Sequence, residues 1–248
     1  MTRQGLLGLA FASFVILAWL CLHVWGVFGY RWTAVGLALA PFLILVQAWL
    51  GTAMFIVAHD AIHGSLAPGR PSLNASIGQL AVGLYAGFSY SKLAGAHRRH
   101  HAEPGTRLDP DFHADAPDRL IPWLTAFFRQ HFGWAEFARV TAVLVIYLVL
   151  GAQVPNLVAF WAVPAGLSAL QLFYFGTFLP HRHTGEPFAD QHRARSQAQS
   201  TVMSFLTCLN FGACHHEHHM CPDLPWWRLP QARRPTGGTR GADAPAAE

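Results

Sequence analysis

Three long runs without a formal charge constrain the fold of this chain more than any other feature. They cover residues 5–30, 32–58 and 140–180, and the last of them is 41 residues long. About 20 apolar residues are enough to cross the hydrocarbon core of a bilayer as a helix. In the whole chain 52% of the residues are hydrophobic and only 12% are charged, which is unusual for a soluble domain. The runs therefore predict membrane-spanning helices.

The lengths of these runs predict the number of spans. The first two runs predict one span each, over about residues 5–30 and 32–58. The third is long enough for two spans, over about 140–152 and 155–180. A cleaved signal peptide is the alternative for the first run, but a second apolar run follows after Arg31 alone and no clear cleavage site intervenes. We expect an all-α integral membrane protein with four transmembrane helices in two hairpins.

The Lys and Arg residues predict the orientation in the membrane. One precedes the first span, one separates the first two spans, eight lie between residues 59 and 139, and seven follow residue 180. By the positive-inside rule, both termini and the central segment face the cytoplasm. The net charge of +4 therefore indicates no nucleic-acid partner. We expect one domain over residues 1–230 and a disordered tail at 231–248, which is rich in Pro, Gly, Ala and Arg.

The chain contains 15 histidines, and nine of them occur in three short boxes; eight of these nine are candidate ligands. The boxes are HDAIH at 59–63, HRRHH at 97–101 and HHEHH at 215–219. On a helix, residues three and four apart share a face, so we expect the candidate ligands of each box to point one way: His59 and His63; His97, His100 and His101; His215, His218 and His219. At about 1.5 Å rise per residue this spacing suits gripping one ion or straddling an adjacent pair. One box alone is a weak signal, but three boxes on one membrane side predict metal binding.

The number and type of ligands indicate which metal is bound. Structural zinc takes four ligands and catalytic zinc usually takes three, so eight imidazoles suggest two ions. The zinc-hydrolase motif H-E-x-x-H fails because Met220 stands where its second histidine belongs. A haem with two axial histidines leaves adjacent pairs such as His100 and His101 unexplained. A pair of non-haem iron ions fits best.

A few residues outside the boxes are further candidates. His181 follows the last span and is a possible ninth ligand, or else a plain interfacial histidine. Asp109 and Asp111 follow the second box, where a carboxylate could accept the N–H of a ligating imidazole; a solvated turn is the alternative. His183 is a weaker candidate than His181, whereas His23, His131 and His192 are interpreted as structural.

The three boxes resemble the H-x(3-4)-H, H-x(2-3)-H-H and H-x(2)-H-H pattern of the membrane fatty-acid desaturase and hydroxylase superfamily. The chain is most similar to the bacterial β-carotene ketolases within it. This similarity covers about residues 51–230 and is carried by FIVAHDAIHGS (55–65), PGRP (68–71), LYAGFS (84–89), DPDF (109–112), FGTFLPHR (175–182), HHEHH (215–219) and PWWRLP (225–230).

The resemblance implies a single desaturase-like domain with a cytoplasmic helical cap that carries a histidine-rich di-iron site. The eight box histidines match family ligands, His181 matches an extra histidine near the last span, and Asp109 matches an Asp-Pro after the second box. Relatives have Asn four residues before the extra histidine, where this chain has Thr177. The last coordination position is therefore left to Thr177, His216 or water.

The resemblance also implies the reaction. Two Fe²⁺ ions and O₂ would oxidise the allylic carbon 4 of carotenoid β-ionone rings to a ketone through two hydroxylations and a dehydration. These steps convert β-carotene through echinenone to canthaxanthin. On rings that already carry a hydroxyl group, they would convert zeaxanthin to astaxanthin. The sequence shows no reductase domain, so an external electron donor such as ferredoxin is expected. The implied location is the bacterial inner (cytoplasmic) membrane, with the active site on the cytoplasmic side.

The carotenoid would enter from the lipid bilayer between the spans. Candidate lining residues are aromatic side chains near the membrane interface: Phe88, Tyr90, Phe173, Phe175, Trp226 and Trp227. A β-carotene hydroxylase or a fatty-acyl desaturase with the same metal site is an alternative function. An alternative from another class is a membrane electron-transfer protein that carries haem.

Overall fold

Residues 1–233 are described by a computed structural model, and every regular element among them is a helix. The elements are α1 (Arg3–Val24), η1 (Trp25–Gly29), α2 (Ala34–His63), α3 (Pro71–Ala86), α4 (Tyr90–Ala102), α5 (Leu120–His131), α6 (Trp134–Val149), α7 (Val154–Leu157), η2 (Val158–Ala162), α8 (Val163–Phe173), η3 (Tyr174–Phe178), α9 (Leu179–His181), α10 (Thr201–Cys208), α11 (His215–Met220) and α12 (Leu229–Ala232). The described residues thus agree with the expected all-α class. From residue 234 onward, the predicted tail at 231–248 lies outside the described residues.

Three helical stretches are long and apolar enough to cross a membrane. They are Arg3–Gly29 with 27 residues, Ala34–His63 with 30 residues and Val154–His181 with 28 residues. Helices α5 and α6 meet at an angle of 76° and add a fourth candidate only if they cross the membrane as one broken span. The predicted span at 140–152 falls on the second part of α6 and the loop after it. The described residues therefore hold three or four candidate spans.

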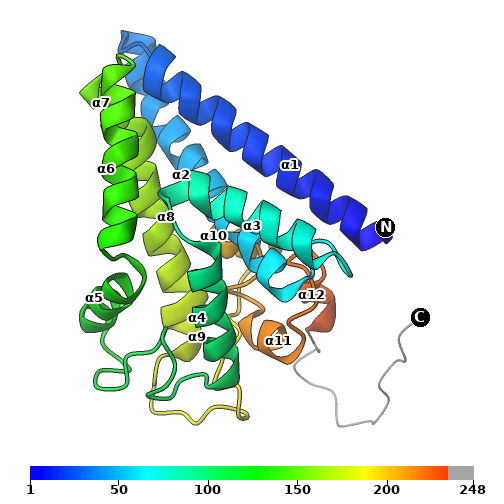
Figure 1. The fold of residues 1–248 in the computed structure, drawn as a ribbon. Helices are drawn as coiled ribbons and strands as arrows, with labels where there is room; N and C mark the ends of the chain where they lie inside the picture. The colour runs from blue at the N-terminus through cyan, green and yellow to red at the C-terminus, as the bar shows by residue number, and fades with distance from the viewer. Residues whose placement is uncertain (234–248) are drawn as a thin grey trace.

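Helices α1 and α2 lie side by side, and a close contact fixes the start of α1 (Figure 1). A Cβ atom at Gly8 would lie 2.1 Å from the backbone oxygen of Leu66, which follows α2 in the chain. The side-chain amide of Gln4 donates a hydrogen bond of 2.8 Å to the backbone oxygen of Ser65. The start of α1 is thus packed against the end of α2 that carries the first histidine box.

At the opposite end of these helices, Asn156 of α7 is hydrogen-bonded to the segment that connects α1 and α2. Its side-chain oxygen accepts a hydrogen bond of 2.7 Å from Nε1 of Trp32. Its side-chain nitrogen donates to the backbone oxygens of Val27 and Tyr30, at 3.3 and 3.2 Å. Asn156 is 2% exposed, so these bonds satisfy its buried amide. They hold the α1–α2 connection against the start of α7.

A buried group of hydroxyls joins α2, α3 and α8 in the middle of the molecule. The hydroxyl of Tyr85 donates to Oγ of Ser168 at 3.0 Å, and Oγ of Ser168 lies 3.1 Å from Oγ of Thr52. All three residues are buried. Because buried polar groups are costly when unpaired, this group favours one relative position of the three helices. The histidine boxes lie beyond it, where α2, α4, α9 and α11 gather (Figure 1).

Candidate metal centre

Five histidines from α2, α4 and α11 form a first group, the five-histidine cluster. Each offers a ring nitrogen, and these atoms lie within 4.8 Å of one another: His59, His63, His97, His101 and His218. The Nε2 atoms of His63 and His97 are 2.8 Å apart. The Nε2 atoms of His101 and His218 are 3.0 Å apart. The first histidine box, at the end of α2, contributes to this cluster only.

Four buried histidines from α4, α9 and α11 form a second group, the four-histidine cluster. Its members, again with ring nitrogens within 4.8 Å of one another, are His100, His181, His215 and His219. Nε2 of His215 lies 2.9 Å from Nε2 of His181 and 3.2 Å from Nε2 of His219. The structure therefore brings His181 together with three box histidines. The nine predicted ligands all lie in one of the two clusters.

The second and third boxes each contribute to both clusters. His97 and His101 lie in the five-histidine cluster, whereas His100 lies in the other. At about 100° per residue, His101 is turned by about 40° around the helix axis from His97. His100 is turned by about 60° from His97 in the opposite direction. We expected the histidines of each box to point one way, and for these two boxes that expectation is wrong. They straddle an adjacent pair of sites, which was one of the two arrangements that the spacing allows.

The distances between nitrogen atoms fit metal coordination. At a metal–nitrogen distance of about 2.1 Å, neighbouring ligands of an octahedral ion are about 3.0 Å apart. The four closest Nε2 pairs are separated by 2.8–3.2 Å. The Nδ1 atoms of His59, His215, His218 and His219 are buried without a hydrogen-bond partner among the described residues. Hydrogen bonds at Nδ1 therefore do not hold these four rings, while the spacing of the Nε2 atoms is compatible with shared metal ions.

The electrostatic setting favours imidazoles in the form that metals bind. Burial lowers the pKa of His97 and His218 well below the usual range, and the neighbouring histidines lower each pKa further. Both side chains are therefore neutral at physiological pH, with a lone pair free on one ring nitrogen. Neutral imidazole is the ligand form for iron and similar ions. The clusters can thus accept cations without first releasing protons from these two rings.

Asp109 holds the ring of His100 in place. Nδ1 of His100 donates to the Asp109 carboxylate, with Oδ2 at 2.9 Å. The backbone N–H groups of Gly105 and Asp111 also donate to this carboxylate, each at 2.8 Å. Burial by itself would lower the pKa of His100, but the hydrogen bond and the charge of Asp109 outweigh it and raise this pKa. With its proton on Nδ1, His100 presents Nε2 to the four-histidine cluster.

The side chain of Asp111 is hydrogen-bonded to His131, at the end of α5, and not to a histidine of the boxes. Nε2 of His131 lies 2.7 Å from Oδ1 of Asp111. Burial alone would raise the pKa of Asp111, but the hydrogen bond and the charge of His131 lower it overall. His131 thus has a specific partner beside the cavity, although its position in the sequence suggests only a structural residue. No spacing signal could have found the pair, since 20 residues separate its members.

The two protein residues considered for the last coordination position lie in different places. Nε2 of His216 is 2.8 Å from Oδ2 of Asp190, and His216 is in neither cluster. Thr177 lines an internal cavity together with His100 and His215 of the four-histidine cluster. Thr177 therefore lies on the side of this cluster from which a further ligand could approach, while His216 is turned toward Asp190.

The internal cavity has a volume of about 130 Å³ and lies beside both clusters. Its polar wall includes four cluster histidines: His59, His97, His100 and His215. Most of the rest is apolar. It comes from α2, α4, α5 and α8 and from the connections between helices, with members such as Phe55, Ile62, Phe88, Leu93, Phe127, Phe128, Phe132, Leu172 and Phe211. Of the six aromatic residues predicted to line a substrate slot, only Phe88 lines this cavity.

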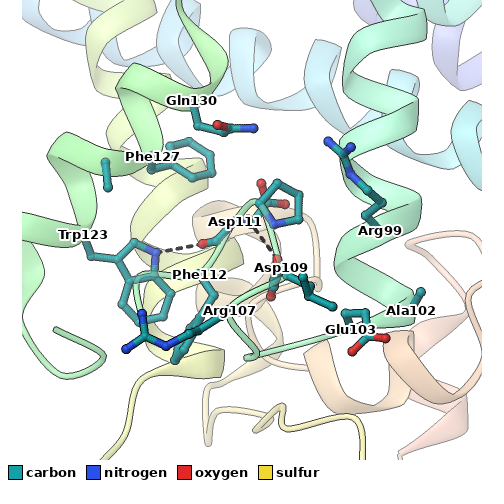
Figure 2. Close-up of a pocket in the computed structure, with 13 residues that line it drawn as sticks. Arg99, Ala102, Glu103, Arg107, Asp109, Asp111, Phe112, Trp123, Phe127 and Gln130 are labelled. Atoms are coloured by element: carbon teal, nitrogen blue, oxygen red, sulfur yellow. Dashed lines mark hydrogen bonds between the residues drawn. The ribbon is translucent and has the colours of Figure 1, made fainter. Parts of the chain in front are cut away.

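A second, open hollow of about 620 Å³ lies outside the cavity (Figure 2). Its wall combines apolar residues with polar ones such as Arg99, Glu103 and Arg107. Figure 2 shows Asp109 and Asp111 between α4 and α5, with the indole N–H of Trp123 donating to the backbone oxygen of Asp111. Asp111 and Phe127 line both the outer hollow and the inner cavity. They therefore form part of the wall between the two.

Comparisons with known proteins give consistent results. The profile of the fatty acid desaturase family matches residues 31–140 and 123–241. A β-carotene ketolase of Paracoccus sp. (strain PC1) is 44% identical over 237 residues, which cover 96% of each chain. A β-carotene ketolase of Paracoccus sp. (strain N81106) is 46% identical over 220 residues, 88% of this chain and 89% of the relative. A zeaxanthin 4-ketolase of Chlamydomonas reinhardtii is 37% identical over 245 residues, 94% of this chain and 54% of the relative.

Proposed function

The chain belongs to the fatty acid desaturase family, and from this premise we propose that it is a ketolase of carotenoid β-ionone rings. It converts the allylic carbon 4 of the ring to a ketone, taking β-carotene through echinenone to canthaxanthin. The observation that carries the proposal is an apolar cavity with histidines of both clusters in its wall. The supporting relatives are two β-carotene ketolases at 44% and 46% identity. Zeaxanthin, with hydroxylated rings, is a further proposed substrate, leading to astaxanthin.

We propose that the two clusters hold two iron ions, one in each. The five-histidine cluster offers five ring nitrogens and the four-histidine cluster offers four, which leaves an octahedral ion at least one open position. Bound iron would supply the activation of O₂ that attack on an allylic C–H bond requires. A haem is disfavoured because contacts of 2.8–3.2 Å between Nε2 atoms leave no room for a porphyrin between the rings.

The proposed reaction consists of two successive oxidations of the same ring carbon, and each oxidation is balanced in atoms and electrons. Each round inserts one oxygen atom of O₂ into a C–H bond and releases the other as water, which consumes two electrons and two protons. The first round gives the 4-hydroxy compound. The second gives a geminal diol that loses water and leaves the ketone. We propose that the electrons come from an external donor such as a ferredoxin.

The residues of the chain bind and orient the reactants. The phenylalanines and aliphatic side chains of the cavity bind the apolar ring and exclude bulk water. Asp109 orients His100 by accepting its Nδ1–H. Phe128 and Phe132 line the cavity and are also each 37% exposed. We propose that the carotenoid enters from the bilayer beside these two residues of α5 and its C-terminal end.

We also propose a membrane arrangement for the chain. Four spans form two hairpins, with the α5–α6 pair contributing the third span, in a bacterial inner membrane. The segment from 59 to 139 carries eight Lys and Arg residues, which favours a cytoplasmic location for it, for both termini and for the cap that holds the clusters. The α1–α2 connection, which is hydrogen-bonded to Asn156 of α7, lies at the opposite end. There, Arg31 is the basic residue of the α1–α2 connection.

A feeding experiment tests the proposed function. The chain is expressed in a bacterial host that makes β-carotene, and the pigments are separated by HPLC. We expect the wild-type chain to produce echinenone and canthaxanthin. A His101→Ala chain, which lacks one ligand of the five-histidine cluster, should produce no ketone. Zeaxanthin as the only new pigment would identify a hydroxylase instead. Unchanged carotenoids with altered membrane lipids would identify a fatty-acyl desaturase.

A further inference from the structure

Few groups in the apolar cavity can bind a hydroxyl group. Apart from the cluster histidines, the polar side chains in its wall belong to Tyr85, Asp111, His131, Thr177 and Cys208. This matters because the first oxidation places a hydroxyl on the ring. An alcohol without a hydrogen-bond partner in an apolar site is bound less tightly than one with a partner. A residue that supplies this partner would influence whether the ring remains for the second oxidation.

Tyr85 and Cys208 are poor candidates for this role. The hydroxyl of Tyr85 already donates to Ser168, at 3.0 Å. The thiol of Cys208 is a weak hydrogen-bonding group, and burial raises its pKa to about 12, so that it remains uncharged. Thr177 remains as a possible partner and is therefore included in the test below.

Asp111 has the geometry of a fixed acceptor. Its Oδ1 accepts from Nε2 of His131 at 2.7 Å, while its Oδ2 has no hydrogen-bond partner within residues 1–233 and is not sealed from its surroundings. Its backbone is held on both sides, since its N–H donates to Asp109 at 2.8 Å and its oxygen accepts from Trp123 at 2.8 Å (Figure 2). A carboxylate oxygen of Asp111 lies within 4.8 Å of a ring nitrogen of His100. The Asp111 side chain is therefore fixed beside His100 of the four-histidine cluster, in the wall of the cavity.

We propose that Asp111, positioned by His131, binds the hydroxyl group of the 4-hydroxy intermediate and retains it in the cavity for the second oxidation. The inference rests on the proposed function and assigns a product-determining role to this pair. A hydrogen bond to a charged acceptor strengthens binding by about tenfold to a hundredfold. Without it, the alcohol leaves for the bilayer more often before it is oxidised again. The ketone is then no longer the main product.

The test compares three variants by the ratio of 4-hydroxy to 4-keto carotenoids in the β-carotene host. Asp111→Leu removes the acceptor at similar size, and we expect this ratio to rise about tenfold or more. Asp111→Asn removes the charge but keeps a hydrogen-bonding side chain, and it should raise the ratio less than Asp111→Leu does. The matched control is Asp190→Leu, which breaks the similar pair with His216 outside the cavity and should leave the ratio unchanged. The variants are compared at equal amounts of folded protein and at low conversion of β-carotene, because a released intermediate can bind again and be oxidised later.

His131 is tested as a positioning residue in the same way. His131→Gln can still donate to Asp111 and should keep the low ratio, whereas His131→Leu should raise it. If Thr177→Val raises the ratio and Asp111→Leu does not, Thr177 is the partner and the proposal is wrong. If the wild-type chain forms no ketone, the proposed function itself has failed. Ketone formation by wild type and Asp111→Leu with equal ratios would overturn this inference alone.

A binding measurement covers the case in which Asp111→Leu makes no product. Quenching of tryptophan fluorescence reports carotenoid binding to the iron-loaded protein in detergent, without an electron donor, so that no oxidation takes place. We expect wild type to bind a 4-hydroxy carotenoid about tenfold more tightly than the unsubstituted one, and Asp111→Leu to lose this preference. The same preference in both proteins would contradict the proposal.

Discussion

Replacement of Asp109 by Asn should weaken the binding of one metal ion and spare the other. Asp109 contacts His100, a member of the four-histidine cluster, through Nδ1 at 2.9 Å. No hydrogen bond joins Asp109 to a member of the five-histidine cluster within the part of the chain that the structure describes. The two sites should therefore respond differently to the same substitution.

The size of the effect follows from the contacts of the carboxylate. Asp109 is buried and accepts three N–H groups, from His100, Gly105 and Asp111, at 2.8–2.9 Å. An Asn side chain has one acceptor oxygen, and its NH₂ group would face one of these donors. Loss of such a carboxylate behind a ligating histidine typically lowers metal affinity 10–100-fold. This corresponds to about 1.4–2.7 kcal/mol of binding free energy.

Anaerobic equilibrium dialysis of the metal-free protein against buffered Fe²⁺ measures this effect. We expect two binding steps for wild type, and for Asp109→Asn one unchanged step and one shifted to higher free iron. Asp190→Asn, which alters an acceptor for His216 outside both clusters, should leave both steps unchanged. An equal shift of both steps, or no shift, would refute the assignment of Asp109 to one site.

Three further predictions concern the clusters and the helices that position them. His181→Ala should reduce bound iron from two ions to one, measured by elemental analysis, while His183→Ala, two residues away and exposed, should keep both. Gly8→Ala should lower the melting temperature in detergent, because its Cβ would lie 2.1 Å from a backbone oxygen; Gly166→Ala, with nothing within 4 Å, is the control and should not. Asn156→Leu should cost about 1–3 kcal/mol of stability in denaturant titrations, because it removes three hydrogen bonds and leaves buried groups unpaired.

The clusters were predictable from sequence because helical spacing is a local property. Histidines four apart, such as His97 and His101 or His215 and His219, do lie in the same cluster. The division of the second and third boxes between two sites was not predictable, because it depends on how α4 and α11 lie relative to α2 and α9. Spacing describes the face of one helix, whereas the partner of that face is set by tertiary packing.

Features that join distant segments could not be predicted at all. His131 contacts Asp111 because α5 packs its C-terminal end over the cavity, and nothing in the spacing of the two residues indicates this. Five of the six aromatic residues predicted to line a substrate slot do not line this cavity, for the same reason. Phe173, for example, is 1% exposed and packs with Trp123 and Phe178 instead. The sequence places aromatic residues near the interface but does not show which side of a helix faces the cavity.

The iron content of anaerobically purified protein tests the central claim most directly, since the account depends on nine histidines forming two sites. Elemental analysis together with the protein concentration gives the number of iron ions for each chain. The account predicts two, in protein without the Soret absorption band of haem. One iron ion for each chain, zinc in place of iron, or a Soret band would contradict it.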